Sequence, residues 1–219
     1  MWFGMRARGM VIPKFLMNAV GDGGRDVFAP GGDLALRFVT ASPELTLSLG
    51  YAYYGMPETP FKPSDGPDTD WEIIESDLST LRLALDIMWS WALDDAEVVR
   101  FRFGGSVGLG VAFIGDINRT QAYPTGDPGD PDSYQKCIGP DNPRGTYAFC
   151  NQLDKDFDHY DGYAEPSWFE GGARPLVYAW AVFPQMAFEV RASEDVAIEI
   201  EGGWSLSGFL TGIGVHFGL

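Results

Sequence analysis

Apolar and polar residues alternate over long stretches of this chain, and that period of two limits its fold more than any other feature. In segment 99–113 the odd positions carry valine, leucine and phenylalanine, with Gly105 the one exception, and the even positions carry arginine, glycine, serine and alanine. Segment 81–91 places leucine, isoleucine and tryptophan opposite mainly small or polar residues. Successive side chains of a strand point to opposite faces, so each stretch predicts a strand with one apolar face.

Eight such stretches occur, at about residues 3–11, 34–38, 45–53, 81–91, 99–113, 178–190, 196–206 and 209–219. Tight turns are expected near 42–44, 93–96 and 193–195. Between them lie long connections at 12–32, 55–75 and 115–175, and a small turn at 207–208. This alternation brings both termini to the tight-turn end, where the first and last strands can pair. The expected fold is all-β: a single domain over 1–219 that forms a closed, eight-stranded, antiparallel up-and-down barrel with long loops at one end.

Composition excludes several classes of function. The chain has 31 acidic and 15 basic residues and a net charge of −16, which argues against binding to a phosphate backbone, so no nucleic-acid partner is expected. Two cysteines and two histidines do not have zinc-site spacing, and no cofactor is expected. No apolar run is long enough for a membrane-spanning helix, although the strands of a transmembrane barrel remain compatible with the sequence.

The alternation allows two opposite barrels. A soluble, lipocalin-like carrier would turn its apolar face inward around a ligand, whereas a membrane barrel would turn it outward to lipid. Three observations favour the membrane barrel. All four lysines fall in the expected long loops: Lys14, Lys62, Lys136 and Lys155. Aromatic residues of the apolar face gather near strand ends, as in the girdles of membrane barrels: Tyr51, Tyr53, Trp89, Trp91 and Trp204.

The third observation is the make-up of the other face, which is rich in small residues and arginine. Its expected charged members, forming a salt-bridge network across the lumen, are Arg6, Arg8, Arg37, Arg82, Asp86, Arg100, Arg102, Glu189, Arg191, Glu199 and Glu201. Arginines outnumber acids in this set, and Glu75 and Asp77 are expected to offset part of the excess. In the strand at 178–190, Tyr178, Trp180 and Val182 are expected to share the outward face with Phe188.

These patterns resemble the small eight-stranded outer-membrane barrels of Gram-negative bacteria, similar to the OmpA transmembrane domain, OmpX and OmpW. The resemblance covers nearly the whole chain. Residues 212–219 look like the insertion signal read by the barrel-assembly machinery, but they end in Leu219 where an aromatic residue is usual. The chain is also similar to outer-membrane proteins without an assigned activity, so the resemblance implies a location and no specific function. Secretion requires a signal peptide, and none precedes the first strand, so we expect this numbering to begin after its removal.

The loop at 115–175 holds the other candidate sites. Cys137 and Cys150 are expected to form a disulfide on the cell exterior, contributing about 3 kcal/mol through loop closure; free buried thiols are the alternative. A weak calcium site is conceivable at Asp127, Asp130 and Asp132, with further carboxylates at Asp154, Asp156, Asp158 and Asp161, although a solvated acidic loop is the simpler interpretation.

The same loop is rich in aromatic residues: Tyr123, Tyr134, Tyr147, Phe149, Phe157, Tyr160, Tyr163, Trp168 and Phe169. They predict either a surface that recognises a protein or glycan or a small core that packs the loop on the barrel rim. Glu199, Glu201 and His216 form an imaginable acid–base set, but a structural role suits a narrow lumen better, and catalysis is not expected.

Together the sequence predicts an outer-membrane barrel with a charge-plugged lumen that acts as a structural or recognition protein through long acidic extracellular loops. Its expected partners are the lipid bilayer, lipopolysaccharide and the barrel-assembly machinery. The alternative function is a barrel that binds or transports a small molecule, and the third is the soluble carrier.

Overall fold

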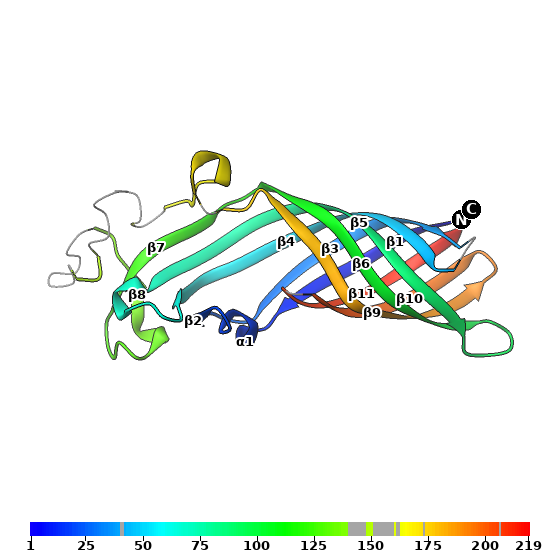
Figure 1. Ribbon diagram of the computed structural model, residues 1–219, viewed down its shortest axis with the longest axis horizontal. Helices are drawn as coiled ribbons and strands as arrows, with labels where there is room; N and C mark the ends of the chain where they lie inside the picture. The colour runs from blue at the N-terminus through cyan, green and yellow to red at the C-terminus, as the bar shows by residue number, and fades with distance from the viewer. Residues whose placement is uncertain (40–41, 140–147, 151–159, 161–162, 173, 206) are drawn as a thin grey trace.

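The computed structural model describes residues 1–39, 42–139, 148–150, 160, 163–172, 174–205 and 207–219. Eight strands form the wall: β1 (Trp2–Ile12), β3 (Val27–Phe38), β4 (Glu44–Pro63), β5 (Glu72–Ala92), β6 (Val99–Ile114), β9 (Val177–Ser193), β10 (Val196–Ser205) and β11 (Gly208–Gly218). Each pairs antiparallel with its neighbours, and β11 pairs with β1 to close the sheet. The predicted eight-stranded antiparallel barrel is confirmed, with both termini at the end away from the long connections (Figure 1). Within the described ranges no helix has the length and apolar character needed to span a bilayer.

The register fixes the stagger of the strands. From Trp91 of β5, paired residues lead around the barrel through Phe101, Phe188, Ile200, Ile213, Ala7, Gly32 and Tyr51 back to β5 at Leu81. The return point is ten residues before the start. Such a stagger goes with strands tilted by roughly 35–45° and, for eight strands, with an interior just wide enough to be filled by side chains.

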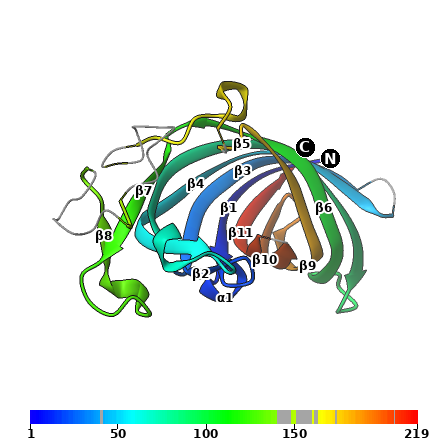
Figure 2. The same cartoon turned by 60° about the vertical axis from the view of Figure 1, so that its left-hand side comes forward.

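Strands β4 and β5 continue well beyond the barrel, so most of the loop expected at 55–75 is a paired hairpin. Three short strands add to this extension: β2 (Gly21–Gly23) on β4, β7 (Ile117–Pro124) on β5, and β8 (Tyr134–Lys136) on β7. One short helix, α1 (Lys14–Met17), and three 3-10 turns, η1 (Asp68–Asp70), η2 (Pro131–Ser133) and η3 (Trp168–Glu170), complete the elements. We call the part built on β2, β7, β8 and the outer ends of β4 and β5 the loop-end assembly; it projects from one side of the barrel mouth (Figures 1 and 2).

The two faces of the wall follow the predicted parity over most of the barrel. Leucine, valine and aromatic side chains of β4, β5 and β6 are exposed on the outside, whereas Arg82, Asp86 and Arg102 are buried inside. β9 departs from the prediction, because Trp180 and Val182 are 4% and 1% exposed and point inward. Between Gln185 and Val182, β9 holds one more residue than β6 does between Gly104 and Ser106. An extra residue in one strand is a β-bulge and reverses the side-chain parity beyond it.

The same reversal turns Tyr178 inward, where it packs against a cluster of buried apolar side chains that includes Trp180 and Val182. The outward prediction for Tyr178, Trp180 and Val182 is therefore wrong. By sequence alternation Leu206 belongs to the outer face with Ile200 and Trp204, but it lies outside the described residues.

One stretch of the wall is incomplete at the loop end. The β9–β10 pairing stops at Gln185 and Gly203, although β9 continues toward the loop end as far as Val177. Among the described residues, the segment 177–184 pairs with β6 on one side and with no strand on the other. β9 therefore has a free edge above the short β10–β11 hairpin.

Candidate functional site

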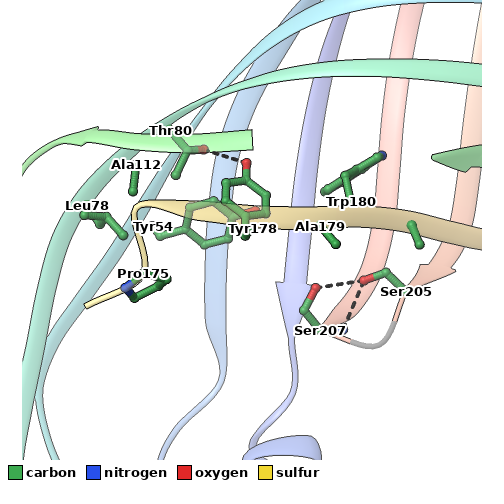
Figure 3. Close-up of a pocket in the computed structure, with 11 residues that line it drawn as sticks. Tyr54, Leu78, Thr80, Ala112, Pro175, Tyr178, Ala179, Trp180, Ser205 and Ser207 are labelled. Carbon is green, nitrogen blue, oxygen red and sulfur yellow. Dashed lines mark hydrogen bonds between the residues drawn. The ribbon is translucent and has the colours of Figure 1, made fainter. Parts of the chain in front are cut away.

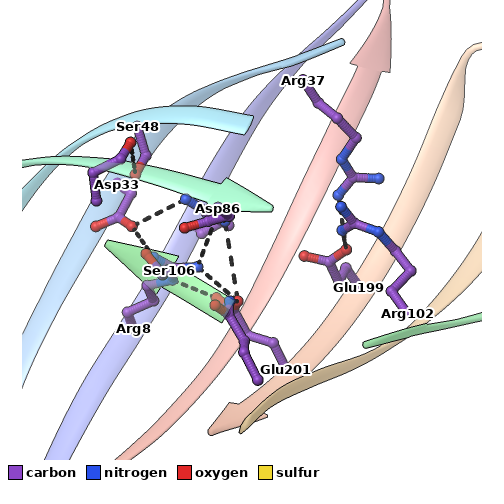
Figure 4. A network of polar contacts seen from close by, with 12 residues as sticks. Arg8, Asp33, Arg37, Ser48, Asp86, Arg102, Ser106, Glu199 and Glu201 are labelled. Atoms are coloured by element: carbon purple, nitrogen blue, oxygen red, sulfur yellow. Dashed lines mark hydrogen bonds and ion pairs between the residues drawn. The ribbon is translucent and has the colours of Figure 1, made fainter. Parts of the chain in front are cut away.

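The lumen nearer the termini holds a network of buried ion pairs, in which Asp33 accepts from three arginines (Figure 4). Asp33 Oδ2 accepts from Arg8 Nη1 at 2.6 Å and from Arg6 Nη2 at 3.2 Å, and Oδ1 accepts from Arg82 Nη2 at 2.7 Å. Arg6 Nη1 also donates to Asp86 Oδ2 at 2.6 Å. Three guanidinium groups thus converge on one carboxylate, in the planar fork geometry that suits arginine.

Arg8 also forms a two-point pair with Glu201, through Nε to Oε1 and through Nη2 to Oε2 at 2.7 Å. Gln185 Nε2 donates to the same Oε2 at 2.9 Å, so a neutral amide helps to satisfy this carboxylate. Gly212 of β11 lies opposite Glu201 in the pairing of β10 with β11. A Cβ on Gly212 would stand 2.8 Å from Glu201 Oε1, so the missing side chain makes room for the ion pair.

A second cluster fills the lumen closer to the tight-turn end. Glu199 Oε2 accepts from Arg37 Nη2 at 2.7 Å and also from Arg102 Nη1, and Arg37 Nη1 donates to Glu189. His216 Nε2 lies 3.0 Å from Arg37 Nη2 and 3.6 Å from Glu199 Oε1. His216 is therefore held inside the network, which leaves it in a structural position.

The structure brings the predicted lumen residues together, with two arginines at the margin. Arg100 Nη2 lies 3.9 Å from Glu44 Oε1, and Arg191 Nε lies 3.9 Å from Glu189 Oε1. Both side chains are more exposed than the other arginines of the set, with 17% and 30% of their surface accessible. These two arginines therefore lie at the margin of this network of ion pairs, which we call the charged plug.

Two acids of the network are not among the residues predicted from the sequence. Asp33 and Glu44 are buried in the lumen, where Glu44 Oε2 lies 3.1 Å from Arg102 Nε. Each has the inward parity of its strand but lies one residue before the strand predicted from the alternation, at 34–38 and 45–53. Extending the alternation by one residue would have found both.

Asp33 and Glu44 bring the network to six buried acids and seven arginines. The excess of positive charge expected in the lumen therefore nearly disappears. Glu75 and Asp77 do not offset it, because they lie in the loop-end assembly. Glu75 Oε1 accepts from Asn118 Nδ2 at 3.0 Å, and Asp77 Oδ1 accepts from the Asp116 backbone N–H at 2.6 Å.

The loop-end half of the lumen is apolar and contains a cavity of about 350 Å³ (Figure 3). Its inner lining includes Tyr54, Leu78, Ala112, Tyr178 and Trp180. A cluster of buried apolar side chains lies between this cavity and the charged plug, on the side toward the termini. Its buried members are Met10, Ala29, Ala84, Trp180, Val182 and Leu210. The lumen is thus divided into a charged half and an apolar half, a division that sequence analysis did not predict.

The loop-end assembly has its own small core and a disulfide. Cys137 and Cys150 are bonded as predicted, with Cα atoms 5.8 Å apart. The rings of Trp71 and Tyr134 pack at a tilt of 34° with centres 4.9 Å apart, beside Ile73 and Ala122. Burial raises the pKa of Tyr134 to about 12, and the nearby carboxylates of Asp68 and Asp127 act in the same direction.

Two of the three calcium candidates, Asp127 and Asp130, hold a turn together through their side chains, and Asp132 takes part through its backbone N–H. Asp127 Oδ1 accepts from the Gly129 backbone N–H at 2.9 Å, and Asp130 Oδ1 accepts from the Asp132 N–H at 3.1 Å. Among the residues with defined positions, no group of three or more His, Cys, Asp or Glu side chains is arranged to hold a metal ion. The further carboxylates at 154, 156, 158 and 161 lie outside the described residues, as do Tyr147, Phe157 and Lys155.

The geometry defines a closed eight-stranded antiparallel β-barrel with a charged plug and an apolar cavity. No family model matches the sequence, and no curated protein matches it. Among solved structures, the N-terminal β-barrel domain of Pseudomonas aeruginosa OprF is similar, with 11% sequence identity and a TM-score of 0.34 over 99% of this chain and 96% of that chain. The assignment of the barrel therefore rests on the strand pairing described above.

Proposed function

We propose that this chain spans the bacterial outer membrane as a closed barrel and presents the loop-end assembly to the exterior. One observation carries the proposal: the barrel buries its ionic side chains in the lumen and exposes an apolar wall. Leu83, Val107, Leu109 and Ile200 are each more than half exposed, whereas Asp33 and Arg82 are buried. Water would favour the opposite arrangement, and lipid favours this one.

The height of the apolar wall supports a membrane location. From Leu81 to Trp91, β5 rises about 33 Å along the strand, which is about 25 Å along the barrel axis at a tilt of about 40°. This matches the roughly 25 Å apolar band of outer-membrane barrels. Aromatic contacts stand at the tight-turn margin, where Phe101 lies between Trp91 and Phe188 with ring centres 6.2 and 5.2 Å away.

The plug supports a structural or recognition role over that of a pore. Its ion pairs include Arg37–Glu189 and Arg6–Asp86, which join strands four and three positions apart around the eight-stranded wall and so cross the lumen. The loop-end assembly is well suited to recognition, because its own core and disulfide hold it in shape while Trp168 and Phe169 remain exposed. Its proposed partners are lipopolysaccharide and an external protein or glycan, and insertion would depend on the barrel-assembly machinery.

A second candidate function, binding of a small apolar molecule, is favoured by one specific observation. The cavity lies within the barrel and falls in the roughly 300–1,000 Å³ range of small-molecule sites. Transport across the barrel would require the plug to move, so binding is the form of this function that the geometry supports best.

The membrane proposal is tested by expressing the chain with a secretion signal and fractionating the cells. The protein is expected in the outer-membrane fraction, and the folded barrel is expected to migrate faster in detergent gels before heating than after it. A protein that stays soluble and shows no heat-dependent shift would contradict the proposal and favour the soluble carrier.

A further inference from the structure

We propose that the apolar cavity binds one hydrocarbon chain of an amphiphile, which reaches it sideways from the membrane past the free edge of β9. This inference rests on the proposed membrane location and assigns the cavity its ligand and route of access.

The lining selects hydrocarbon. Leu78, Ala112 and Trp180 offer carbon surface, and the hydroxyl of Tyr178 is already engaged as donor to Thr80 Oγ1 at 3.1 Å. Trp180 Nε1 is likewise committed, to Ser106 Oγ at 3.1 Å. Apart from the hydroxyls of Tyr54, Ser205 and Ser207, this lining is apolar or already hydrogen-bonded, so a sugar or an ion would lose most of its hydrogen bonds to water without replacement, whereas an apolar chain gains by leaving water.

The opening lies in the wall. Ala179 and Ala181 border the cavity, yet both are exposed on the outer face of β9. Their partners on β6 are Leu109 and Val107, which belong to the exposed apolar wall. The cavity therefore meets the outer face inside the apolar band, beside the segment 177–184 that lacks a partner on its other edge.

Polar groups lie at the mouth of the cavity, and they favour an amphiphile as the ligand rather than a plain hydrocarbon. A free strand edge carries unpaired backbone N–H and C=O groups, and these are costly to leave without partners in lipid. Ser205 and Ser207, which also line the cavity, place hydroxyl oxygens 2.9 Å apart beside this edge (Figure 3). A carboxylate, hydroxyl or phosphate head at the mouth would bind these groups while its chain fills the cavity.

The test is photo-crosslinking in vesicles that contain the folded protein. Two probes carry a diazirine at the end of a hydrocarbon chain: dodecanoate, as a free single-chain amphiphile, and a two-chain phosphatidylglycerol, as a membrane lipid. Peptide mass spectrometry then locates the adducts. Adducts on inward residues such as Leu78 and Trp180 are expected beside adducts on outward residues such as Leu83, which any lipid around the barrel produces.

The matched variants are Ala112→Phe, which fills the cavity from β6, and Ala7→Phe, which adds the same side chain to the outer wall. Inward adducts are expected to fall at least about tenfold in Ala112→Phe, a loss of about 1.4 kcal/mol in binding, and to persist in Ala7→Phe. Outward adducts serve as the internal standard for both.

Inward adducts from dodecanoate alone would identify a free amphiphile as the ligand, and inward adducts from both probes would identify a membrane lipid. Adducts confined to outward residues of the parent protein overturn the inference, even if neither variant folds. A parent protein that does not fold into vesicles contradicts the membrane proposal itself, whereas one that folds but gives no inward adduct contradicts this site alone.

Discussion

The guanidinium carbon of Arg82 lies 3.9 Å from the centre of the Trp180 ring. This contact joins the two halves of the lumen, because Arg82 pairs with Asp33 in the charged plug and Trp180 lines the apolar cavity. A cation over an aromatic face is attracted by the ring, and more strongly where water is excluded. The Trp180 ring therefore covers the Arg82 guanidinium group where the charged plug borders the apolar cavity.

Charge on the outer wall is expected to be costly only within the apolar band. Leu83 and Leu93 are almost equally exposed, at 56% and 57%, but Leu83 lies within β5 and Leu93 lies just after the strand ends. Leu83→Arg should cost about 2–4 kcal/mol of folding free energy in lipid, and Leu93→Arg about 0–1 kcal/mol. Urea titration of folding into vesicles measures both, and equal tolerance of the two variants would argue for a soluble barrel.

Removing the charge of Asp33 should destabilise the barrel strongly. Asp33→Asn leaves three buried guanidinium groups short of a counter-charge, and breaking a buried pair in this way costs about 3–5 kcal/mol. Asp195→Asn, an exposed position in the turn before β10, is the control and should change stability little. An Asp33→Asn barrel as stable as the control would mean that the plug does not depend on this carboxylate.

The plug should make the parent protein a poor conductor of ions. Planar-bilayer recordings are expected to show little or no steady current. Replacing both members of the Arg8–Glu201 pair by serine removes two long side chains that meet in the lumen, and current should then increase. A large, stable current from the parent protein would refute the plug and favour transport.

The disulfide should stabilise the loop-end assembly and leave the barrel unaffected. Non-reduced peptide maps should contain Cys137 linked to Cys150, and a Cys137→Ser, Cys150→Ser variant should be cut faster by protease within residues 115–175. Heat-modifiable migration should stay as in the parent, because both cysteines lie outside the barrel strands. Two free thiols in protein from native membranes would contradict an exterior location for this loop.

High pH should loosen the loop-end assembly through Tyr134. Its pKa is raised to about 12 from about 10, so the neutral phenol stabilises the folded form fully below pH 10, and this contribution is lost as pH rises through about 12. The phenol also donates to the Pro128 carbonyl oxygen at 3.1 Å, a bond that ionisation removes. In an absorbance titration, Tyr134→Phe should lower the amplitude of the step near pH 12 by one tyrosine; an amplitude unchanged in the variant would assign the step to other tyrosines.

The candidate site was only partly predictable from sequence. Inward parity identified Arg6, Arg8 and Glu201 correctly, because side-chain direction in a regular strand depends only on position along it. Asp33 and Glu44 were missed because strand ends are set by pairing with a neighbouring strand, which a single segment does not reveal.

Residue alternation and the cysteine count were enough to predict the eight strands of the barrel wall, their closed antiparallel order, the face that each regular strand turns outward, and the pairing of Cys137 with Cys150. Which arginine pairs with which acid follows only from the folded barrel, since contacts across the lumen depend on the stagger of all eight strands. The same holds for the reversed parity of Trp180 and the free edge of β9. A bulge and an unpaired edge are relations between two strands, and the alternation within either strand carries no record of them.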